Sequence, residues 1–181
     1  ESSEIIRMFN FVFNDLTKNK IDYYPKELRK NIDSINSNIY ESLNNGVYQS
    51  GFATTQIAYE NAFRKLFVCI GELEKILGNQ RFLIGNTITE ADWRLFTTLI
   101  RFDLVYYSHF KTNLRRIIDY PELYGYTCDL YQHSGIKETI DFEHIKHHYY
   151  YSHETINPSR VVPVGPEITF DFSHKRNERF S

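Results

Sequence analysis

Apolar residues recur every three or four positions along most of this chain, and that spacing restricts its fold more than any other feature of the sequence. An α-helix turns once in 3.6 residues, so side chains spaced in this way share one face and can be buried together. A strand would alternate apolar and polar residues, and no convincing run of that kind occurs. The pattern therefore predicts an all-α bundle. Three early helices carry it through Ile5, Met8, Phe9, Val12, Phe13 and Leu16; Leu28, Ile32, Ile35, Ile39 and Leu43; and Phe63, Leu66, Phe67, Ile70, Leu73 and Leu77.

The stretch "ITEADWRLFTTLIRFD" (88–103) carries an unusually complete signal for the start of a helix. Thr89 stands at the N-cap and Asp92 three residues later, so each side chain can accept a hydrogen bond from a backbone N–H that the first turn leaves free. Ile88 can pack against Trp93 as a hydrophobic staple across this start. A central helix is therefore predicted to begin directly after Thr89.

The remaining chain is predicted to form shorter elements and a tail. One helix opens near "YPEL" (120–123), and another covers most of 136–151, whereas the Gly- and Asn-rich stretch 44–53 reads as a break. The last residues, from 156 to 181, include three prolines within ten positions and have no helical period. They predict an extended tail that crosses the surface and frays near its end. The chain is thus expected to be one helical domain, 1–181.

Composition and charge exclude several classes of function. The formal charge of −2 and the pI near 6.4 provide no basic surface for nucleic acid or an anionic membrane. No apolar run approaches the roughly 20 residues of a spanning helix, and no signal peptide is visible. Cys69 and Cys128 suit neither a disulfide framework nor a zinc site, and a reducing, cytoplasmic setting is the simplest interpretation. No cation stands where it would activate either thiol, so both are predicted to be packing residues.

Four histidines and three tyrosines crowd the segment "HIKHHYYYSH" (144–153). His144 and His148 are four residues apart and would share a helix face, a spacing that can hold a metal. A zinc site needs a third ligand, and a catalytic helix of that kind carries a Glu after the first His. Ile145 stands there instead, so no metal site is predicted. For His148 and His153, a supporting role beside a pocket stays open.

The chain contains 14 tyrosines and 14 phenylalanines, more than a helical core requires. A phenol both donates and accepts a hydrogen bond and adds an apolar ring for stacking. Tyr48 lies in the glycine-bounded break, from which a side chain could reach a cleft, and Tyr149, Tyr150 and Tyr151 must diverge around a helix. A pocket for a hydroxylated aromatic ring and ordinary packing both stay open on the residues alone.

Several motifs resemble one family over nearly the whole chain. They are "ESSEIIRMFN" (1–10), "NNGVYQSGFATTQIAYE" (44–60), "ITEADWRLFTTLIRFDLVYYSHFKTN" (88–113), "DYPELYGYTCDLYQ" (119–132) and "HIKHHYYYSHETINPSRVVPVGP" (144–166). These closely resemble glutathionyl-hydroquinone reductases, the Xi class of glutathione transferases. The resemblance implies a two-domain enzyme of which this chain is the helical C-terminal domain, without the N-terminal thioredoxin-like domain.

The resemblance also implies roles for particular residues. Glu1 and Ser2 match the pair that holds the γ-glutamyl group of glutathione, and Tyr48 and Tyr149 match the tyrosines that bind the hydroquinone hydroxyls. The catalytic cysteine of the family lies in a Cys-Pro motif of the thioredoxin-like domain, so no catalytic residue is expected in this chain. Glutathione is the implied co-substrate, without a metal, and a homodimer through the helical domains is the implied assembly.

Two other interpretations stay open. The chain could be a non-catalytic binding or assembly module of glutathione-transferase origin, or part of a general glutathione transferase. Its first residue, Glu1, stands in the middle of a family motif, which favours truncation over loss of the catalytic domain. On that hypothesis this chain alone is inactive.

Overall fold

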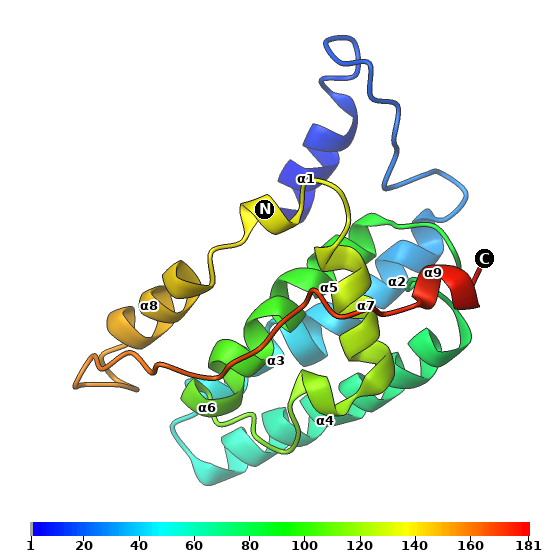
Figure 1. The fold of residues 1–181 in the computed structure, drawn as a ribbon. Helices are drawn as coiled ribbons and strands as arrows, with labels where there is room; N and C mark the ends of the chain where they lie inside the picture. The colour runs from blue at the N-terminus through cyan, green and yellow to red at the C-terminus, as the bar shows by residue number, and fades with distance from the viewer. Residues whose placement is uncertain (1) are drawn as a thin grey trace.

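A computed structural model describes residues 2–181, and over that range the protein is a helical bundle without β-strands, as predicted (Figure 1). Helix α4 packs against α3 and α7, and α5 packs against α2 and α7. None of the helices in this range is both long enough and apolar enough to cross a lipid bilayer. In chain order the elements are α1 (Ser2–Phe11), α2 (Arg29–Ile39), the π-helical segment η1 (Tyr40–Asn44), α3 (Gly46–Gly51), α4 (Gln56–Asn79), α5 (Glu90–Arg101), the π-helical segment η2 (Phe102–Tyr106), α6 (Tyr107–His109), the 3-10 turn η3 (Ile117–Asp119), α7 (Pro121–Tyr131), the 3-10 turn η4 (Lys137–Thr139), α8 (Phe142–Ser152) and α9 (Arg176–Arg179).

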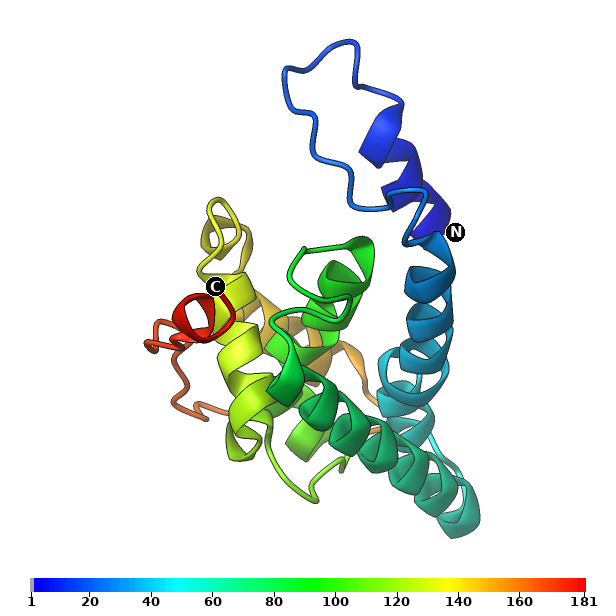
Figure 2. The ribbon, with the colours of Figure 1, turned by 90° about the vertical axis from the view of Figure 1, so that its right-hand side faces the viewer.

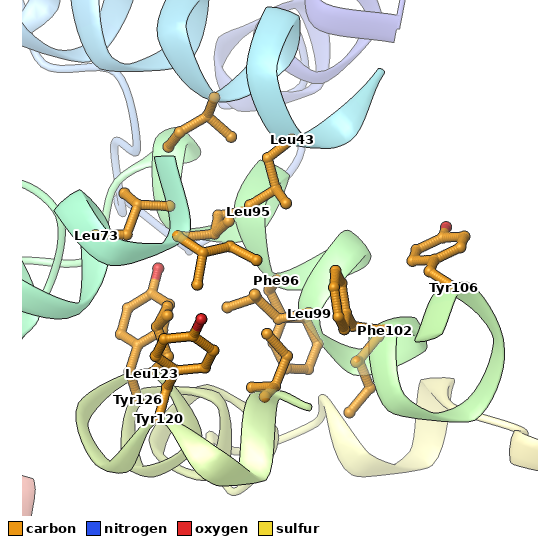
Figure 3. Close-up of a cluster of buried hydrophobic side chains, with 14 of the residues drawn as sticks. Leu43, Leu73, Leu95, Phe96, Leu99, Phe102, Tyr106, Tyr120, Leu123 and Tyr126 are labelled. Carbon is orange, nitrogen blue, oxygen red and sulfur yellow. The ribbon is translucent and has the colours of Figure 1, made fainter. Parts of the chain in front are cut away.

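The hydrophobic core lies among α4, α5 and α7 (Figure 3). The side chains of Leu73 in α4, Leu95 in α5 and Leu123 in α7 are each no more than 1% exposed. Burying one such side chain contributes about 1.5–3 kcal/mol. The apolar faces predicted for the second and third helices are therefore confirmed as the faces that form this core, since Ile32 and Leu66 are also fully buried.

The first apolar stripe behaves differently. Helix α1 ends at Phe11, whereas the spacing predicted a helix that continues to Leu16, and no residue of α1 is buried. Phe9 is 61% exposed and Leu16 is 85% exposed. In Figure 2, α1 and the loop after it project from the bundle. The prediction was wrong beyond Phe11, since residues 12–16 continue the apolar spacing without continuing the helix.

Helix α5 begins at Glu90, and the predicted capping box of Thr89 and Asp92 is present. The buried Asp92 carboxylate accepts hydrogen bonds from Thr89 N (2.8 Å) and Thr89 Oγ1 (3.0 Å). It also accepts from Leu83 N (2.9 Å) and from the hydroxyl of Tyr126 (2.8 Å). The same side chain that caps α5 thus ties it to the loop after α4 and to α7.

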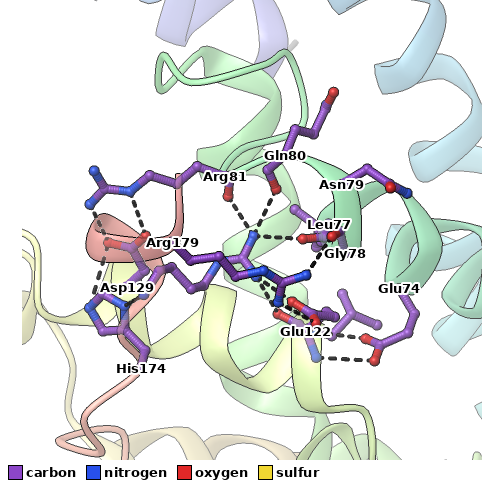
Figure 4. Close-up of polar contacts among 12 residues, drawn as sticks. Glu74, Leu77, Gly78, Asn79, Gln80, Arg81, Glu122, Asp129, His174 and Arg179 are labelled. Carbon is purple, nitrogen blue, oxygen red and sulfur yellow. Dashed lines mark hydrogen bonds and ion pairs between the residues drawn. The ribbon is translucent and has the colours of Figure 1, made fainter. Parts of the chain in front are cut away.

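Helix α8 covers most of 136–151, as predicted, and the short turn η4 precedes it. The tail beyond α8 runs extended across the surface as expected, but its end is not frayed. Arg176, 3% exposed, donates from Nη2 to the carbonyl oxygens of Leu77, Gln80 and Arg81 at 2.8–3.0 Å. Figure 4 labels these three acceptor residues at the end of α4. The last carbonyls of a helix lack partners within it. The guanidinium therefore supplies the C-terminal cap of α4 and anchors the tail.

Candidate functional site

Tyr48 lies on the short helix α3 and not in a loop, so the predicted break at 44–53 was wrong. Gly51 at the end of α3 makes this placement possible, because a Cβ atom there would overlap the ring of Phe110. With α3 seated this closely, the Phe110 ring packs against that of Tyr48, with centroids 5.3 Å apart. The glycine therefore permits the close approach that positions Tyr48.

Tyr48 and Tyr149 are far apart in sequence, yet their hydroxyl oxygens form a hydrogen bond of 2.6 Å. A third phenol, Tyr106, forms a hydrogen bond of 2.8 Å with Tyr149. The exposed fraction falls from 37% at Tyr48 to 6% at Tyr149 and 3% at Tyr106. We call Tyr48, Tyr149 and Tyr106 the phenol chain. It leads from the surface into the core through three different helical elements.

Tyr106 is the member that sequence reasoning missed. It lies four residues after the buried Phe102, at the helical spacing of a core residue, so the sequence signal was packing and nothing more. Tyr106 is the last residue of the π-helical segment η2. The other π-helical segment, η1, begins at Tyr40 and ends at Asn44. π-helical turns are rare and frequently occur at functional sites. Both segments contribute side chains to the same cavity.

The phenol chain opens into a cavity of about 520 Å³ beside α1. This volume suits a small organic ligand. Arg94 and Arg101 bring positive charge to its wall, and no acidic side chain belongs to the lining within residues 2–181. The site therefore combines phenolic hydroxyls, aromatic rings and cations, a set that favours an anionic or hydroxylated aromatic guest. The lining residues are Ser2, Ile6, Tyr40, Asn44, Tyr48, Trp93, Arg94, Thr97, Thr98, Arg101, Tyr106 and Tyr149.

Burial controls the ionisation of the inner phenols. It raises the pKa of Tyr149 to about 12. It also raises the pKa of Tyr106 well above the usual value for tyrosine, with a further contribution from the neighbouring phenols. Both side chains are therefore neutral at pH 7, and each retains one proton to donate.

Ser2 lies in the first turn of α1 and lines this cavity. It also lines an adjacent hollow of about 590 Å³ together with Ser3 and Arg94. Glu1, the other residue expected to contact glutathione, lies outside the described residues. The structure thus places Ser2 beside the same opening as Tyr48 and Tyr149.

Comparisons with known proteins agree with one another. Residues 56–127 match the family model "Glutathione S-transferase, C-terminal domain". Glutathionyl-hydroquinone reductase YqjG of Escherichia coli K12 is 52% identical over 180 residues, 99% of this chain and 55% of the relative. Glutathionyl-hydroquinone reductase PcpF of Sphingobium chlorophenolicum is 54% identical over 92% of this chain and 53% of its own length. The Xi class glutathione transferase structure from Natrialba magadii superposes with a TM-score of 0.96 at 44% identity, over 98% of this chain and 54% of that one. The chain belongs to the Xi class of glutathione transferases.

This Xi-class chain spans about half the length of the curated relatives it matches. The glutathione-bound structure of the Escherichia coli homologue YqjG shows the same proportion. Its TM-score is 0.97 at 52% identity, over 99% of this chain and 59% of that one. The match in fold thus extends through α1, the bundle and the docked tail.

Two histidines of this Xi-class chain, His148 and His153, pack against Tyr149. No group of three potential ligands from His, Cys, Asp and Glu comes together in residues 2–181. The rings of His148 and His153 stand edge-on to Tyr149, with centroids 5.1 and 5.4 Å away. His153 Nδ1 and His109 Nε2 form a hydrogen bond of 3.2 Å. Burial lowers the pKa of His109 to about 4, so this pair is neutral at pH 7.

Both cysteines are buried and free. Cys69 is 2% exposed and Cys128 is 0% exposed, and burial raises the pKa of each thiol to about 11. A thiol attacks as its thiolate, which neither residue forms to a useful extent at neutral pH. Their surroundings agree with the packing role that the sequence predicted.

Proposed function

We propose that this chain is the helical, substrate-binding half of a glutathione-dependent reductase that removes glutathione from glutathionyl-hydroquinones. The observation that carries the proposal is the phenol chain, which opens into a cation-lined cavity beside the start of α1. The phenolic hydroxyls of Tyr48 and Tyr149 form hydrogen bonds with a ring hydroxyl of the substrate. The names of the two curated relatives support this substrate class.

In this proposal, glutathione lies between the phenol chain and the first turn of α1. Free backbone N–H groups at a helix N-terminus attract a carboxylate. The Ser2 hydroxyl adds a donor there, and Glu1 pairs with the amino group of the γ-glutamyl moiety. Arg94 lines both adjoining hollows and brings a cation to the same region. Binding of glutathione by the Escherichia coli homologue supports this assignment.

The nucleophile comes from a thioredoxin-like domain that precedes this chain. Its cysteine thiolate attacks the glutathione sulfur of the substrate: an S–S bond forms and the bond from sulfur to the ring breaks. The ring keeps the electron pair and takes up a proton, leaving as the hydroquinone. A second glutathione thiolate then releases the cysteine as its thiolate and forms glutathione disulfide. The high pKa values of Cys69 and Cys128 support a nucleophile elsewhere.

The exposed apolar side chains of α1 support the same arrangement. Phe9 and Phe11 are more than half exposed, and α1 buries none of its residues. An apolar helix face of this kind commonly marks a surface that another domain covers. The thioredoxin-like domain packs on this face in our proposal.

We also propose that the protein is a homodimer in the cytoplasm. Light scattering of the full-length protein tests the homodimer directly.

Kinetics of the full-length protein with a glutathionylated hydroquinone test the proposal. Tyr48→Phe and Tyr149→Phe should each lower kcat/KM by about tenfold or more, the effect of losing roughly 1.4 kcal/mol of transition-state stabilisation. Tyr151→Phe is the matched control, because Tyr151 lies on the same helix as Tyr149 but is 45% exposed. An inactive full-length protein, or unchanged kinetics in both site variants, would contradict the proposed function.

A further inference from the structure

We propose that Tyr106 is a positioning residue that donates a hydrogen bond to Tyr149 and thereby strengthens the hydroxyl proton that the phenol chain presents to a ligand in the cavity. This inference rests on the proposed function for the identity of the substrate, and on the geometry of the phenol chain for the role of Tyr106. Tyr106 lines the cavity but is only 3% exposed, and its hydroxyl forms a hydrogen bond of 2.8 Å with that of Tyr149. It adds a third, interior member to the pair of tyrosines expected from the sequence.

Counting protons fixes the direction. Three phenols carry three protons and share two hydrogen bonds, so one proton is left over. Within residues 2–181, the hydroxyl of Tyr106 has Tyr149 as its only hydrogen-bond partner. If Tyr106 accepted that bond, its own proton would be buried without an acceptor. Leaving a buried donor unpaired is unfavourable, so Tyr106 donates to Tyr149.

Two arrangements remain, and both leave the spare proton on the cavity side. In one, Tyr149 donates to Tyr48, and Tyr48 directs its proton into the cavity. In the other, Tyr48 donates to Tyr149, and Tyr149 directs its proton outward. Tyr48, at 37% exposure, is the member with access to a ligand in either case. Because Tyr106 donates to Tyr149, the Tyr149 hydroxyl has a donor and not an acceptor on its buried side, and the spare proton of the chain stays on the cavity side.

A net donor suits the chemistry of a departing hydroquinone. When the bond from sulfur to the ring breaks, the electron pair stays with the ring, and a ring oxygen that gains negative charge is a stronger acceptor. Donors aimed at developing charge stabilise the transition state more than the ground state. The bond from Tyr106 also polarises Tyr149, because hydrogen bonds in a chain strengthen one another. Tyr106 thus assists the reaction through its hydrogen bond to Tyr149.

Binding of 4-nitrophenolate tests this role without any turnover. The ion accepts hydrogen bonds, and its visible absorption reports whether the bound probe is ionised. In the full-length protein, Tyr106→Phe should weaken binding of 4-nitrophenolate by about 5- to 10-fold and shift the pKa of the bound probe upward relative to the unmodified protein. Binding of the methyl ether, 4-nitroanisole, should change less than twofold. Replacement of Tyr106 by 3-fluorotyrosine, a stronger donor, should shift the probe in the opposite direction.

The matched control is Tyr126→Phe. Tyr126 is fully buried and donates a hydrogen bond of 2.8 Å to Asp92, outside the cavity lining. This variant should lose stability but bind both probes as the unmodified protein does. Steady-state kinetics provide a second readout, in which Tyr106→Phe should lower kcat by about 5- to 10-fold and change KM by less than twofold.

Each outcome decides between the two proposals. Unchanged probe binding and kinetics in Tyr106→Phe, with Tyr149→Phe impaired, would overturn the role of Tyr106 and leave the proposed function standing. Equal loss of affinity for 4-nitrophenolate and 4-nitroanisole would also overturn it, because that pattern indicates collapse of the cavity. A full-length protein that binds 4-nitrophenolate as expected but does not act on glutathionyl-hydroquinones would contradict the proposed function alone.

Discussion

Asp92→Ala should destabilise the fold far more than loss of an ordinary helix cap. The substitution leaves Leu83 N, Thr89 N and the Tyr126 hydroxyl without their acceptor, and Asp92 is completely buried. Each buried donor left unpaired costs about 1–3 kcal/mol, so about 4 kcal/mol in total is expected after partial relaxation. Domains are stable by only about 5–15 kcal/mol, so the variant should be close to unfolded at 37 °C.

Urea unfolding followed by circular dichroism measures this effect, with the midpoint and the m-value compared between variants. Thr89→Ala and Tyr126→Phe each remove one partner of Asp92 and should cost about 1 kcal/mol each. The ranking is the test of the reasoning. If Asp92→Ala lowers the free energy of unfolding by no more than Tyr126→Phe does, then Asp92 does not connect α5 to the loop after α4 and to α7.

Three further predictions concern other parts of the molecule. Gly51→Ala should push α3 outward, lower the free energy of unfolding by about 1–3 kcal/mol and weaken 4-nitrophenolate binding, as measured by urea unfolding and absorption titration; a variant as stable as the unmodified chain would contradict the close approach. Arg176→Gln should expose the tail to limited proteolysis and destabilise α4. Arg179→Gln, at a side chain 50% exposed that bonds to Glu122 and to the carbonyl of Gly78, should increase cleavage less. Burial lowers the pKa of His109 from 6.5 to about 4. Between these two values the unfolded chain binds a proton that the folded chain does not, so stability should fall as the pH drops from 6.5 to about 4. In pH-dependent thermal unfolding, His109→Gln should reduce this slope, and His147→Gln, at an exposed histidine, should preserve it.

Much of the fold was accessible from the sequence because it depends on local patterns. The apolar spacing around Leu66 and Leu73 predicts the inner face of α4, and Thr89 with Asp92 predicts where α5 begins. Such signals act within one or two turns of a helix, so they can be interpreted without knowing what lies opposite. The resemblance likewise pointed to Tyr48 and Tyr149, and their hydroxyls do lie within hydrogen-bonding distance.

Other features depended on contacts between residues distant in sequence. The apolar face of α1 resembles that of a core helix, yet nothing in residues 2–181 buries it. Arg176 lies in a polar, charged stretch that predicts fraying. Its burial becomes favourable through the three carbonyls at the end of α4 and the ion pair with Glu122. Tyr106 has the spacing of a packing residue, and its partnership with Tyr149 requires η2 and α8 to meet.

The amino-acid sequence by itself therefore determined that the chain is helical, where α5 and α7 begin and which family the chain resembles. These properties follow from backbone geometry and side-chain chemistry over a few neighbouring residues. Only the tertiary structure decided which hydroxyls share protons, which helix end the tail caps and how deeply Tyr48 is set. Those outcomes depend on burial, because the strength of a hydrogen bond and the cost of leaving a donor unpaired are set by the surroundings that folding creates.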